Sequence, residues 1–327
     1  MARILITGGS GFIGTNLLER YKSEGHDLLN IDHKRPRNAD HRRFWTNVDI
    51  LNNKDLLHKV TREFDPDFLF HLAARTDLDG KTLDDYAANT TGTSNVIEAI
   101  SGLTRLKRIL FTSTRLVCRI GYVPQAEADY CPTTTYGASK IAMEQLIRDA
   151  DRQIPCSWTI FRPTSIWGPW FDVPYKTFFT AIAKGHYVHP GNRTIRKSYG
   201  YVGNIVVQLQ RAMLAPAEAT EKKTFYLADY QPLDVREWAD LIQRTMRTSK
   251  IRTVPVPVLR PVALLGDIAK KAGWNNPFLT SFRLDNLLTE MVYDVEPLQR
   301  FAGPTPYSLE DGVKETVDWM HRHGELG

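Results

Sequence analysis

The stretch TGGSGFIG, directly after the first apolar run of the chain, places the strongest constraint on its fold. Its glycines Gly8, Gly11 and Gly14 are spaced three residues apart and follow the apolar residues 4–6. A strand that turns tightly into a helix needs glycine where backbones approach closely, and the free N–H groups that start the helix favour a pyrophosphate. The stretch therefore predicts a strand, a phosphate-binding turn and a helix that ends near Gly25.

Short apolar runs alternate with amphipathic stretches of helical length through the first half of the chain. The candidate strands are residues 4–7, 27–31, 68–72, 108–112 and 158–162. This alternation predicts an α/β fold with a doubly wound parallel sheet (Rossmann), followed by a smaller, mostly helical C-terminal substrate domain. We place the dinucleotide-binding domain at residues 1–168, with a later contribution from about 198–230, and mainly the substrate-binding domain at residues 169–327.

Composition argues against several classes of protein. No apolar run approaches the roughly 20 residues of a membrane-spanning helix, so no membrane insertion is expected. The three cysteines form no CxxC pair and the nine histidines show no ligand spacing, which predicts neither a disulfide framework nor a metal site. The net charge of +5 comes without a basic stripe interleaved with aromatic residues, so nucleic acid is not expected as a partner. A cytoplasmic location fits these features best.

Asp32 stands 18 residues after Gly14, at the end of the second apolar run. A carboxylate at this place can accept hydrogen bonds from both hydroxyls of an adenosine ribose, which favours NAD as the cofactor. It would repel the 2′-phosphate of NADP, although Lys34, Arg35 and Arg37 are close enough in the sequence to bind one. We therefore expect NAD and keep NADP as the less favoured alternative.

Further motifs follow one another along nearly the whole chain. They are VDI at residues 48–50, HLAA at 71–74, NTTGTSNVIEA from Asn89, LFTSTRLV, YGASK and FRPTSIWGP. Together with TGGSGFIG, they make the chain similar to the extended short-chain dehydrogenase/reductase family. Within that family, FRPTSIWGP and the closing SLEDGVKETVDW most resemble the NAD-dependent nucleotide-sugar epimerase/dehydratase group.

The glycine stretch, Asp32 and the resemblance together define a set of residues expected to bind the cofactor. In the family, VDI flanks the adenine, HLAA ends the fourth strand, and Asn89 helps to position the active-site helix. The expected cofactor-binding residues are Gly8, Gly11, Phe12, Ile13, Gly14, Asp32, Asp49, Ile50, Leu72, Ala73, Ala74, Asn89 and Lys140.

Tyr136 and Lys140 in TYGASK are four residues apart, so on a helix their side chains share one face. A tyrosine suits the deprotonation of an alcohol because their proton affinities are close, but a pKa near 10 is high for neutral pH. We expect the Lys140 ammonium to favour the phenolate by its charge, and the resemblance adds that it holds the nicotinamide ribose. The resemblance also places Thr114 on the reacting oxygen. Ser113 is a further catalytic candidate, or a hydroxyl that caps the strand end.

The resemblance implies that Tyr136 removes a proton from a sugar hydroxyl while NAD takes the hydride. Return of the hydride to the other face of a transient keto-sugar makes a nucleotide-sugar epimerase, with 4-epimerisation as the family default. Arg115 and Leu116 stand where the family's 4,6-dehydratases carry an Asp-Glu pair, which argues against dehydration. One alternative is an NAD(P)-dependent keto-sugar reductase or hydroxysteroid-like alcohol dehydrogenase, favoured by Asn204 at a position that is usually acidic. Another is a catalytically silent nucleotide-binding protein.

Three arginines are candidates for binding the nucleotide-sugar substrate. Arg115 stands beside the reacting centre, where it would meet a uronate or other acidic sugar, or point to solvent. Arg196 matches the family arginine ahead of YV and could pair with a diphosphate, and Arg283 in SFRLDN is a weaker second candidate. The family commonly forms dimers through paired helices around its sheet, so the resemblance also implies a homodimer.

The C-terminal region contains two further helical patterns. The run VPVPVLRPVALLGDIAKKAGW, residues 254–274, could contact a membrane or pack as an amphipathic helix, and we expect core packing. Near the end, Ser308 and Asp311 stand at capping-box spacing, which predicts a terminal helix.

Overall fold

A computed structural model describes residues 1–274 and 279–326 of the protein. Its largest sheet contains β1 (Arg3–Thr7), β2 (Asp27–Asp32), β3 (Trp45–Asn47), β4 (Phe68–His71), β5 (Arg108–Thr112), β6 (Ser157–Pro163) and β11 (Thr224–Leu227). The strands lie in the order β11-β6-β5-β4-β1-β2-β3, and every neighbouring pair runs parallel. All five predicted strands are present, and the prediction of a doubly wound parallel sheet is confirmed.

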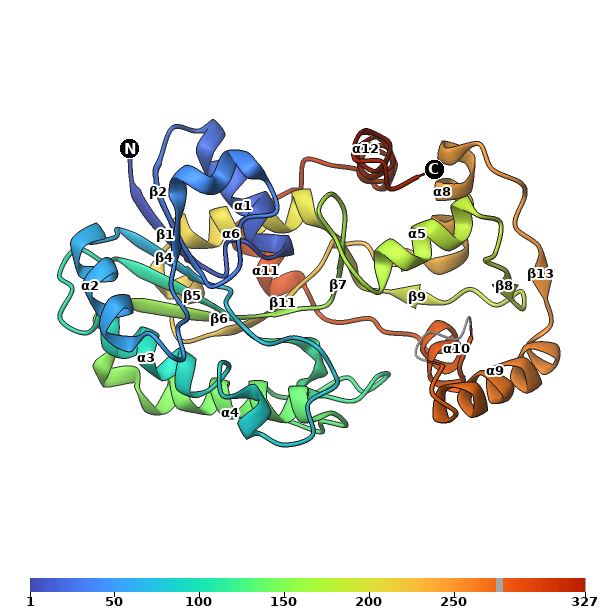
Figure 1. Cartoon of the computed structure of the whole chain (residues 1–327), viewed down its shortest axis with the longest axis horizontal. Coiled ribbons are helices and arrows are strands. Elements are labelled where there is room, and N and C mark those ends of the chain that lie inside the picture. The colour runs from blue at the N-terminus through green and yellow to red at the C-terminus, as the bar shows by residue number, and fades with distance from the viewer. Residues whose placement is uncertain (275–278, 327) are drawn as a thin grey trace.

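Helices cover both faces of this sheet (Figure 1). α1 (Phe12–Ser23) and α6 (Val202–Leu214) lie together on one face, while α2 (Lys54–Phe64), α3 (Thr91–Ile100) and α4 (Thr135–Asp149) cover the other. The strands between these layers are almost fully buried, as expected for a parallel sheet enclosed on both sides.

The later part of the chain builds a second, mostly helical lobe beside the sheet (Figure 1). Its elements are β7 (Ser165–Trp167), α5 (Tyr175–Ala183), β8 (His189–Pro190), β9 (Arg196–Lys197), β10 (Tyr199–Tyr201), β12 (Leu233–Asp234), α8 (Val235–Met246), β13 (Thr253–Val254), α9 (Val256–Lys271), α10 (Ser281–Leu288) and α12 (Leu309–Arg322). Other segments within this stretch return to the sheet, because α6 packs on α1 and β11 pairs with β6. The short helix α7 (Ala217–Thr220) packs on β6, and α11 (Glu296–Ala302) packs on α6 and β11. The domain boundary at residue 168 stays a prediction.

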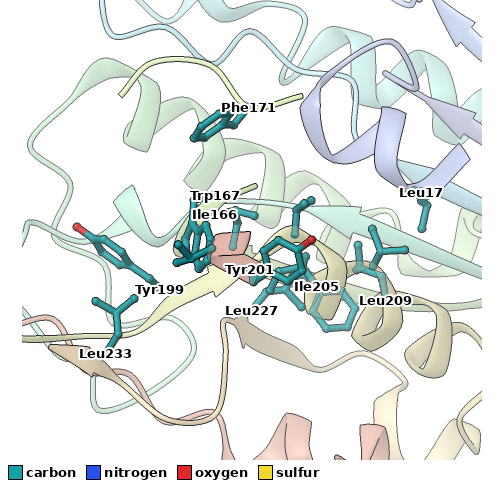
Figure 2. Close-up of a cluster of buried hydrophobic side chains, with 14 of the residues drawn as sticks. Leu17, Ile166, Trp167, Phe171, Tyr199, Tyr201, Ile205, Leu209, Leu227 and Leu233 are labelled. Carbon is teal, nitrogen blue, oxygen red and sulfur yellow. The ribbon is translucent and has the colours of Figure 1, made fainter. Parts of the chain in front are cut away.

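An aromatic cluster joins the lobe to the sheet. Trp167 at the end of β7 is fully buried, and its ring lies 5.2 Å from that of Tyr201 and 5.3 Å from that of Trp238. Figure 2 shows Trp167 beside Ile166 and Tyr201, with Leu227 of β11 close by. This packing fixes β7 and β10 next to the carboxyl ends of the sheet strands.

The chain ends on the predicted helix. Ser308 caps α12 by accepting the N–H of Asp311, and the Asp311 carboxylate accepts the N–H of Ser308 in return, so the predicted capping box is confirmed. Across residues 1–274 and 279–326, none of the helices combines the length and apolar character needed to cross a bilayer.

Candidate active site

The predicted cofactor residues gather at one edge of the sheet. Thr7 at the end of β1 is in register with Ile31 of β2 and with His71 of β4. The glycine turn, Asp32 and residues 72–74 therefore follow neighbouring parallel strands at their carboxyl ends, where open α/β sheets bind ligands.

Gly8 and Gly14 occupy positions where a side chain does not fit. Gly8 has a φ of +76°, and a Cβ built there would lie 2.5 Å from the amide nitrogen of Ala73. A Cβ on Gly14 would lie 2.5 Å from the carbonyl oxygen of Gly8. α1 begins at Phe12, and its N-cap Gly11 offers no side chain to the first N–H groups. The bare turn and these N–H groups fit a pyrophosphate.

Other predicted cofactor residues surround this turn. They are Phe12 and Ile13 in the first turn of α1, and Leu72, Ala73 and Ala74 directly after β4. The Leu72 N–H donates to the Thr7 carbonyl at 2.9 Å, which extends the pairing of β4 with β1 by one residue. The backbone of Ala73 is thereby held against Gly8.

Asp32 ends β2 beside the glycine turn. Its carboxylate accepts the backbone N–H of Ser10 at 3.1 Å and that of Lys34 at 2.8 Å, which fixes its position. Arg37, one of the cations considered for a 2′-phosphate, is instead paired with Asp172 at 3.0 Å. The fixed Asp32 carboxylate would repel a 2′-phosphate, and Arg37 is held by Asp172, so both features favour NAD over NADP.

Asp49 and Ile50 lie between β3 and α2, and both side chains contact other residues of the protein. The Asp49 carboxylate accepts the N–H of Leu51 at 2.9 Å and the side-chain amide of Asn52 at 2.8 Å. Burial acts to raise the pKa of Asp49, but these hydrogen bonds outweigh it and hold the pKa below its usual value. Ile50 is buried over Gly92. A contact of either residue with an adenine stays a prediction.

Asn89 ties the loop after β4 to the active-site helix. Its Oδ1 accepts the N–H of Arg75 at 2.8 Å, and its Nδ2 donates to the Arg75 carbonyl and to Ser139 Oγ at 2.9 Å. Ser139 lies on α4 between the predicted tyrosine and lysine. The buried amide is thus fully satisfied, in a place that suits the expected positioning of this helix.

Tyr136, Lys140 and Thr114 lie together near the start of α4. Thr134 caps this helix by accepting the N–H of Gly137 at 3.0 Å, which places Tyr136 in the first turn and Lys140 one turn later. The Thr114 hydroxyl lies close enough to the Tyr136 hydroxyl to oppose the rise of its pKa, and both residues are only 7% exposed. The structure therefore brings these three predicted catalytic residues together.

The pKa of Tyr136 is not lowered by the Lys140 ammonium, contrary to what the sequence led us to expect. Burial raises the pKa of Tyr136 to about 12, against the opposing hydrogen bond with Thr114. Burial also lowers the pKa of Lys140 to about 7, which Glu144 partly offsets. The Lys140 ammonium donates to the carbonyl of Thr112 at 2.8 Å. Without ligands, desolvation therefore dominates at both groups, and the expected stabilisation of the phenolate by Lys140 is not found.

Ser113 is turned to a different network. Its hydroxyl donates to Glu144 Oε1 at 2.6 Å, and Glu144 accepts both Nε and Nη2 of Arg162, at 2.9 and 2.7 Å. The Tyr130 hydroxyl donates to the other carboxylate oxygen at 2.9 Å. The Ser113 hydroxyl thus bonds to Glu144 of α4, which suits a strand-end hydroxyl that supports this helix, and a catalytic role of Ser113 stays a prediction.

Arg115 is buried beside the catalytic hydroxyls. It opens the 3-10 turn Arg115–Val117, is only 8% exposed, and its Nη1 has no hydrogen-bond partner among the described residues. Burial raises the pKa of Tyr175, Tyr199 and Tyr293, and the Arg115 charge opposes this rise in each. Arg115 thus points into the protein toward the C-terminal lobe and not to solvent.

Lys197 is a second buried cation on this side, and the sequence analysis did not identify it. Burial, with a smaller effect of the Arg115 charge, lowers its pKa to about 7, and its ammonium donates to the Asn286 carbonyl. Side chains alternate along a strand, so its neighbour Arg196 lies on the opposite, exposed face of β9. The structure does not bring the predicted Arg196 together with the buried residues of the site.

A cavity of about 200 Å³ lies next to these groups in the C-terminal lobe. Tyr175 and Tyr199 are among its lining residues, and apolar side chains such as Trp238 and Leu284 make up much of the lining. Arg283 is the cation in this lining, which places it where a substrate group could reach it.

Asn204 has a structural explanation. Its side-chain amide donates to Asp229 at 2.8 Å and to the Tyr307 carbonyl at 3.0 Å, and its oxygen accepts the Tyr307 N–H. It thereby holds the segment before α12 on α6. The residue bears on packing, so it does not favour the reductase alternative.

A match to a family model identifies the family of the chain. Residues 4–228 match the model of the NAD dependent epimerase/dehydratase family. The chain belongs to this family. The resemblance to extended short-chain dehydrogenases/reductases is confirmed, as is the prediction of an NAD-dependent enzyme.

Relatives of this epimerase/dehydratase family match almost the whole chain. The N-acetyl-alpha-D-glucosaminyl-diphospho-ditrans,octacis-undecaprenol 4-epimerase of Escherichia coli O157:H7 is 26% identical, over 98% of this chain and 96% of the relative. The 3-beta-hydroxysteroid dehydrogenase of Mycolicibacterium neoaurum is 27% identical, over 98% and 91%. The solved UDP-glucuronic acid 4-epimerase of Bacillus cereus, in complex with UDP-glucuronic acid and NAD, has a TM-score of 0.74 at 18% identity, over 98% and 99%. This last likeness confirms the predicted Rossmann fold with a helical C-terminal part.

Proposed function

We propose that the protein is an NAD-dependent nucleotide-sugar 4-epimerase that acts through a transient keto-sugar. The observation that carries this proposal is that the buried Tyr136 and Thr114 hydroxyls lie near one another, with Lys140 one helical turn away, at the sheet edge of the glycine turn. A relative named as a 4-epimerase that matches nearly the full length, and a second one that matches 71% of this chain, support the same reaction. We further propose a cytoplasmic location, which the composition and the cysteine pattern favour, and a homodimer, which the family resemblance implies.

In the proposed mechanism, Tyr136 takes the proton of a sugar hydroxyl whose oxygen Thr114 holds by a hydrogen bond. NAD, when bound, supplies the hydride acceptor and a positive charge on its oxidised ring. The Tyr136 phenolate needs such positive charge nearby, because burial alone raises the pKa of Tyr136 to about 12. Lys140 keeps its ammonium on the Thr112 carbonyl, one turn along α4, where it can hold a ribose hydroxyl. After rotation of the keto-sugar, Tyr136 would return the proton to the same oxygen, while the hydride would come back from the cofactor to the other face of the carbonyl carbon and invert it.

Two measurements test the proposed reaction. Mass spectrometry of the released cofactor should identify NAD, and NMR of a nucleotide-sugar panel should show interconversion of two C4 epimers. An epimerase leaves NADH absorbance unchanged at the end of turnover, because the hydride returns to the substrate. Stoichiometric formation of NADH from the same substrates would contradict the proposal.

The second candidate is a dehydrogenase or keto-sugar reductase of the hydroxysteroid type. The mainly apolar lining of the cavity beside Tyr175 and Tyr199 favours it, because such a lining suits an apolar ring system better than a nucleotide. Relatives named as hydroxysteroid dehydrogenases also match almost the whole chain. This candidate predicts a stoichiometric change of NADH absorbance with a hydroxysteroid. The silent nucleotide-binding alternative predicts no turnover with any substrate.

The charge of Asp32 is expected to determine cofactor choice. Asp32→Asn keeps the size of the side chain but removes the charge, so we expect NAD affinity to fall about tenfold, the value of one charge-assisted hydrogen bond. The preference for NAD over NADP should shrink with it. Calorimetric titration of both cofactors measures this, with Asp40→Asn at an exposed position nearby as the matched control. Unchanged preference in Asp32→Asn would rule out Asp32 as the discriminating group.

We also propose that Arg115 binds an acidic group of the substrate, since its buried Nη1 has no hydrogen-bond partner within residues 1–274 and 279–326. Arg115→Met keeps an unbranched apolar stem, so the fold should tolerate it. We expect the ratio of kcat/KM for UDP-glucuronate over UDP-glucose to fall by about tenfold or more, as for loss of a buried charged hydrogen bond. Arg119→Met, at an exposed position four residues on, is the control. A ratio that stays at the wild-type value would exclude this role for Arg115.

A further inference from the structure

The outward face of α9 exposes an unusual number of apolar side chains. Of the fifteen large apolar residues that are exposed in the described part of the chain, seven lie between positions 258 and 282. Five of them form what we call the α9 face: Val258, Val262, Leu264, Leu265 and Ile268, with exposures from 47% to 65%. Positions 258, 262 and 265 follow the spacing of one helical stripe. This concentration is larger than the scattered exposed residues of an ordinary surface.

The expectation that this helix packs into the core is wrong for most of its surface. Only Leu259 and Ala263 of α9 are buried, and they pack on Leu284 of α10. Figure 1 shows α9 at the outer end of the C-terminal lobe, with α10 on one side of it. The α9 face therefore looks away from the rest of the molecule.

Exposed aromatic side chains extend this surface. Trp274 follows the end of α9 and is 64% exposed, and Phe282 on the neighbouring α10 is 60% exposed. Indole and phenyl rings near a cationic helix end are typical of segments that lie at a lipid headgroup boundary.

The segment that leads into and forms α9 is strongly positive in sequence, and Arg260, Lys270 and Lys271 lie on α9 itself. Residues 244–271 contain seven basic side chains, all exposed, and a single acidic one, Asp267. The whole chain has a net charge of +5, so the other 299 residues together carry −1. The basic residues are Arg244, Arg247, Lys250, Arg252, Arg260, Lys270 and Lys271. Asp285 of α10, which lies 3.7 Å from Arg260, offsets one of them.

This positive charge favours an anionic lipid surface over a second copy of the chain as the partner of the α9 face. A symmetric contact with a second copy would bring two such positive segments together, which like-charge repulsion opposes. An anionic lipid surface attracts the cations and accepts the apolar side chains at the same time. α9 has 16 residues and is therefore about 24 Å long, too short to span a hydrocarbon core of roughly 30 Å.

We propose that the α9 face, with Trp274, docks on the surface of a bilayer that contains anionic phospholipid. The helix lies in the plane of the headgroups, with its apolar side chains toward the acyl region and Lys270 and Lys271 at the phosphates. The inner side of α9 contributes Leu259 to the cavity beside Tyr175 and Tyr199, so docking places this cavity close to the lipid. The proposal is independent of the reaction that the site catalyses.

Co-sedimentation of the full chain with lipid vesicles tests the proposal. We expect the wild type to sediment with phosphatidylcholine vesicles that contain phosphatidylglycerol, and much less with phosphatidylcholine alone. Leu265→Glu together with Ile268→Glu should lower the partition coefficient about tenfold or more, because two inserted side chains become charged. Lys270→Glu with Lys271→Glu should cause a similar loss on the anionic vesicles.

The matched control is the pair Leu56→Glu and Leu214→Glu, two exposed leucines outside the α9 face, which should sediment like the wild type. Circular dichroism and NAD retention show that each variant is folded. Wild-type protein that stays in the supernatant with anionic vesicles would overturn the proposal, as would equal losses in the control pair. Light scattering that shows a dimer dissociated by Leu265→Glu and Ile268→Glu, without vesicle binding, would assign the face to a second copy and also overturn it.

Discussion

Tyr136→Phe should lower kcat by about 10³-fold while the protein keeps its NAD. The substitution removes only the hydroxyl that is proposed to take and return the proton, and general acid–base catalysis by one side chain typically contributes about 10²–10⁴-fold. The ring itself remains packed 6.0 Å from that of Tyr86, so the start of α4 keeps its contacts. Turnover by NMR and mass spectrometry of the released cofactor measure the two outcomes separately.

A matched control separates loss of the base from loss of an ordinary tyrosine hydroxyl. Tyr122 donates its hydroxyl to Asp129 at 2.8 Å, outside the site, so Tyr122→Phe should keep nearly full turnover. If Tyr136→Phe turns over at the wild-type rate, Tyr136 is not the base. If instead it purifies without NAD, the phenylalanine has disturbed the cofactor site, and the catalytic assignment loses its support.

The glycine turn shows which part of the site could be predicted from local sequence. A Cβ at Gly8 or Gly14 would lie 2.5 Å from a neighbouring backbone atom, so only glycine fits at these two positions. The short motif already implies these close backbone contacts. The same holds for Tyr136 and Lys140, whose spacing follows from one helical turn. Such features depend on a few adjacent residues and on one known element boundary.

The two-residue strand β9 shows where sequence reasoning fails. The sequence predicts Arg196 as one of three arginines that bind the substrate, but Lys197 is the buried cation of this strand. A strand this short has no pattern of alternation from which to tell its inner from its outer residue, so only tertiary packing decides. A buried lysine with no acidic neighbour in the sequence offered no local signal.

The α9 segment fails for a related reason. Its sequence places apolar residues on more than one side of the helix. Such a pattern predicts that the helix is buried, but it does not identify which element covers each side. The structure buries Leu259 and Ala263 but leaves Val258, Leu265 and Ile268 exposed. Only the arrangement of α9 beside α10 reveals the remaining face.

The Glu144–Arg162 ion pair could not be predicted from the sequence either, because Glu144 lies on α4 and Arg162 on β6, and no local sequence pattern connects the two residues. The Glu144 carboxylate is fully buried and accepts Arg162, Ser113 and Tyr130. Burial alone would lower the pKa of Arg162, but the hydrogen bonds and charge of Glu144 raise it. The pair therefore holds the helix of Tyr136 and Lys140 against the sheet.

Glu144→Gln is expected to lower the free energy of unfolding by about 3–5 kcal/mol, because it leaves the buried Arg162 without a counter-charge. The glutamine NH₂ also presents a donor where Arg162, Ser113 and Tyr130 all need an acceptor. Urea unfolding followed by tryptophan fluorescence measures the change, and turnover per folded molecule should fall as well, since α4 carries the catalytic pair.

The double variant Glu144→Leu with Arg162→Met isolates the charge. It removes both buried ions and leaves apolar side chains of similar volume, so it should be less destabilised than Glu144→Gln, although it lacks every hydrogen bond of the pair. A double variant that unfolds at lower urea than Glu144→Gln would mean that the hydrogen bonds, and not the uncompensated charge, dominate. Wild-type stability in Glu144→Gln would mean that α4 is held by its apolar contacts alone, since Met143 and Ile147 on the same helix are also fully buried.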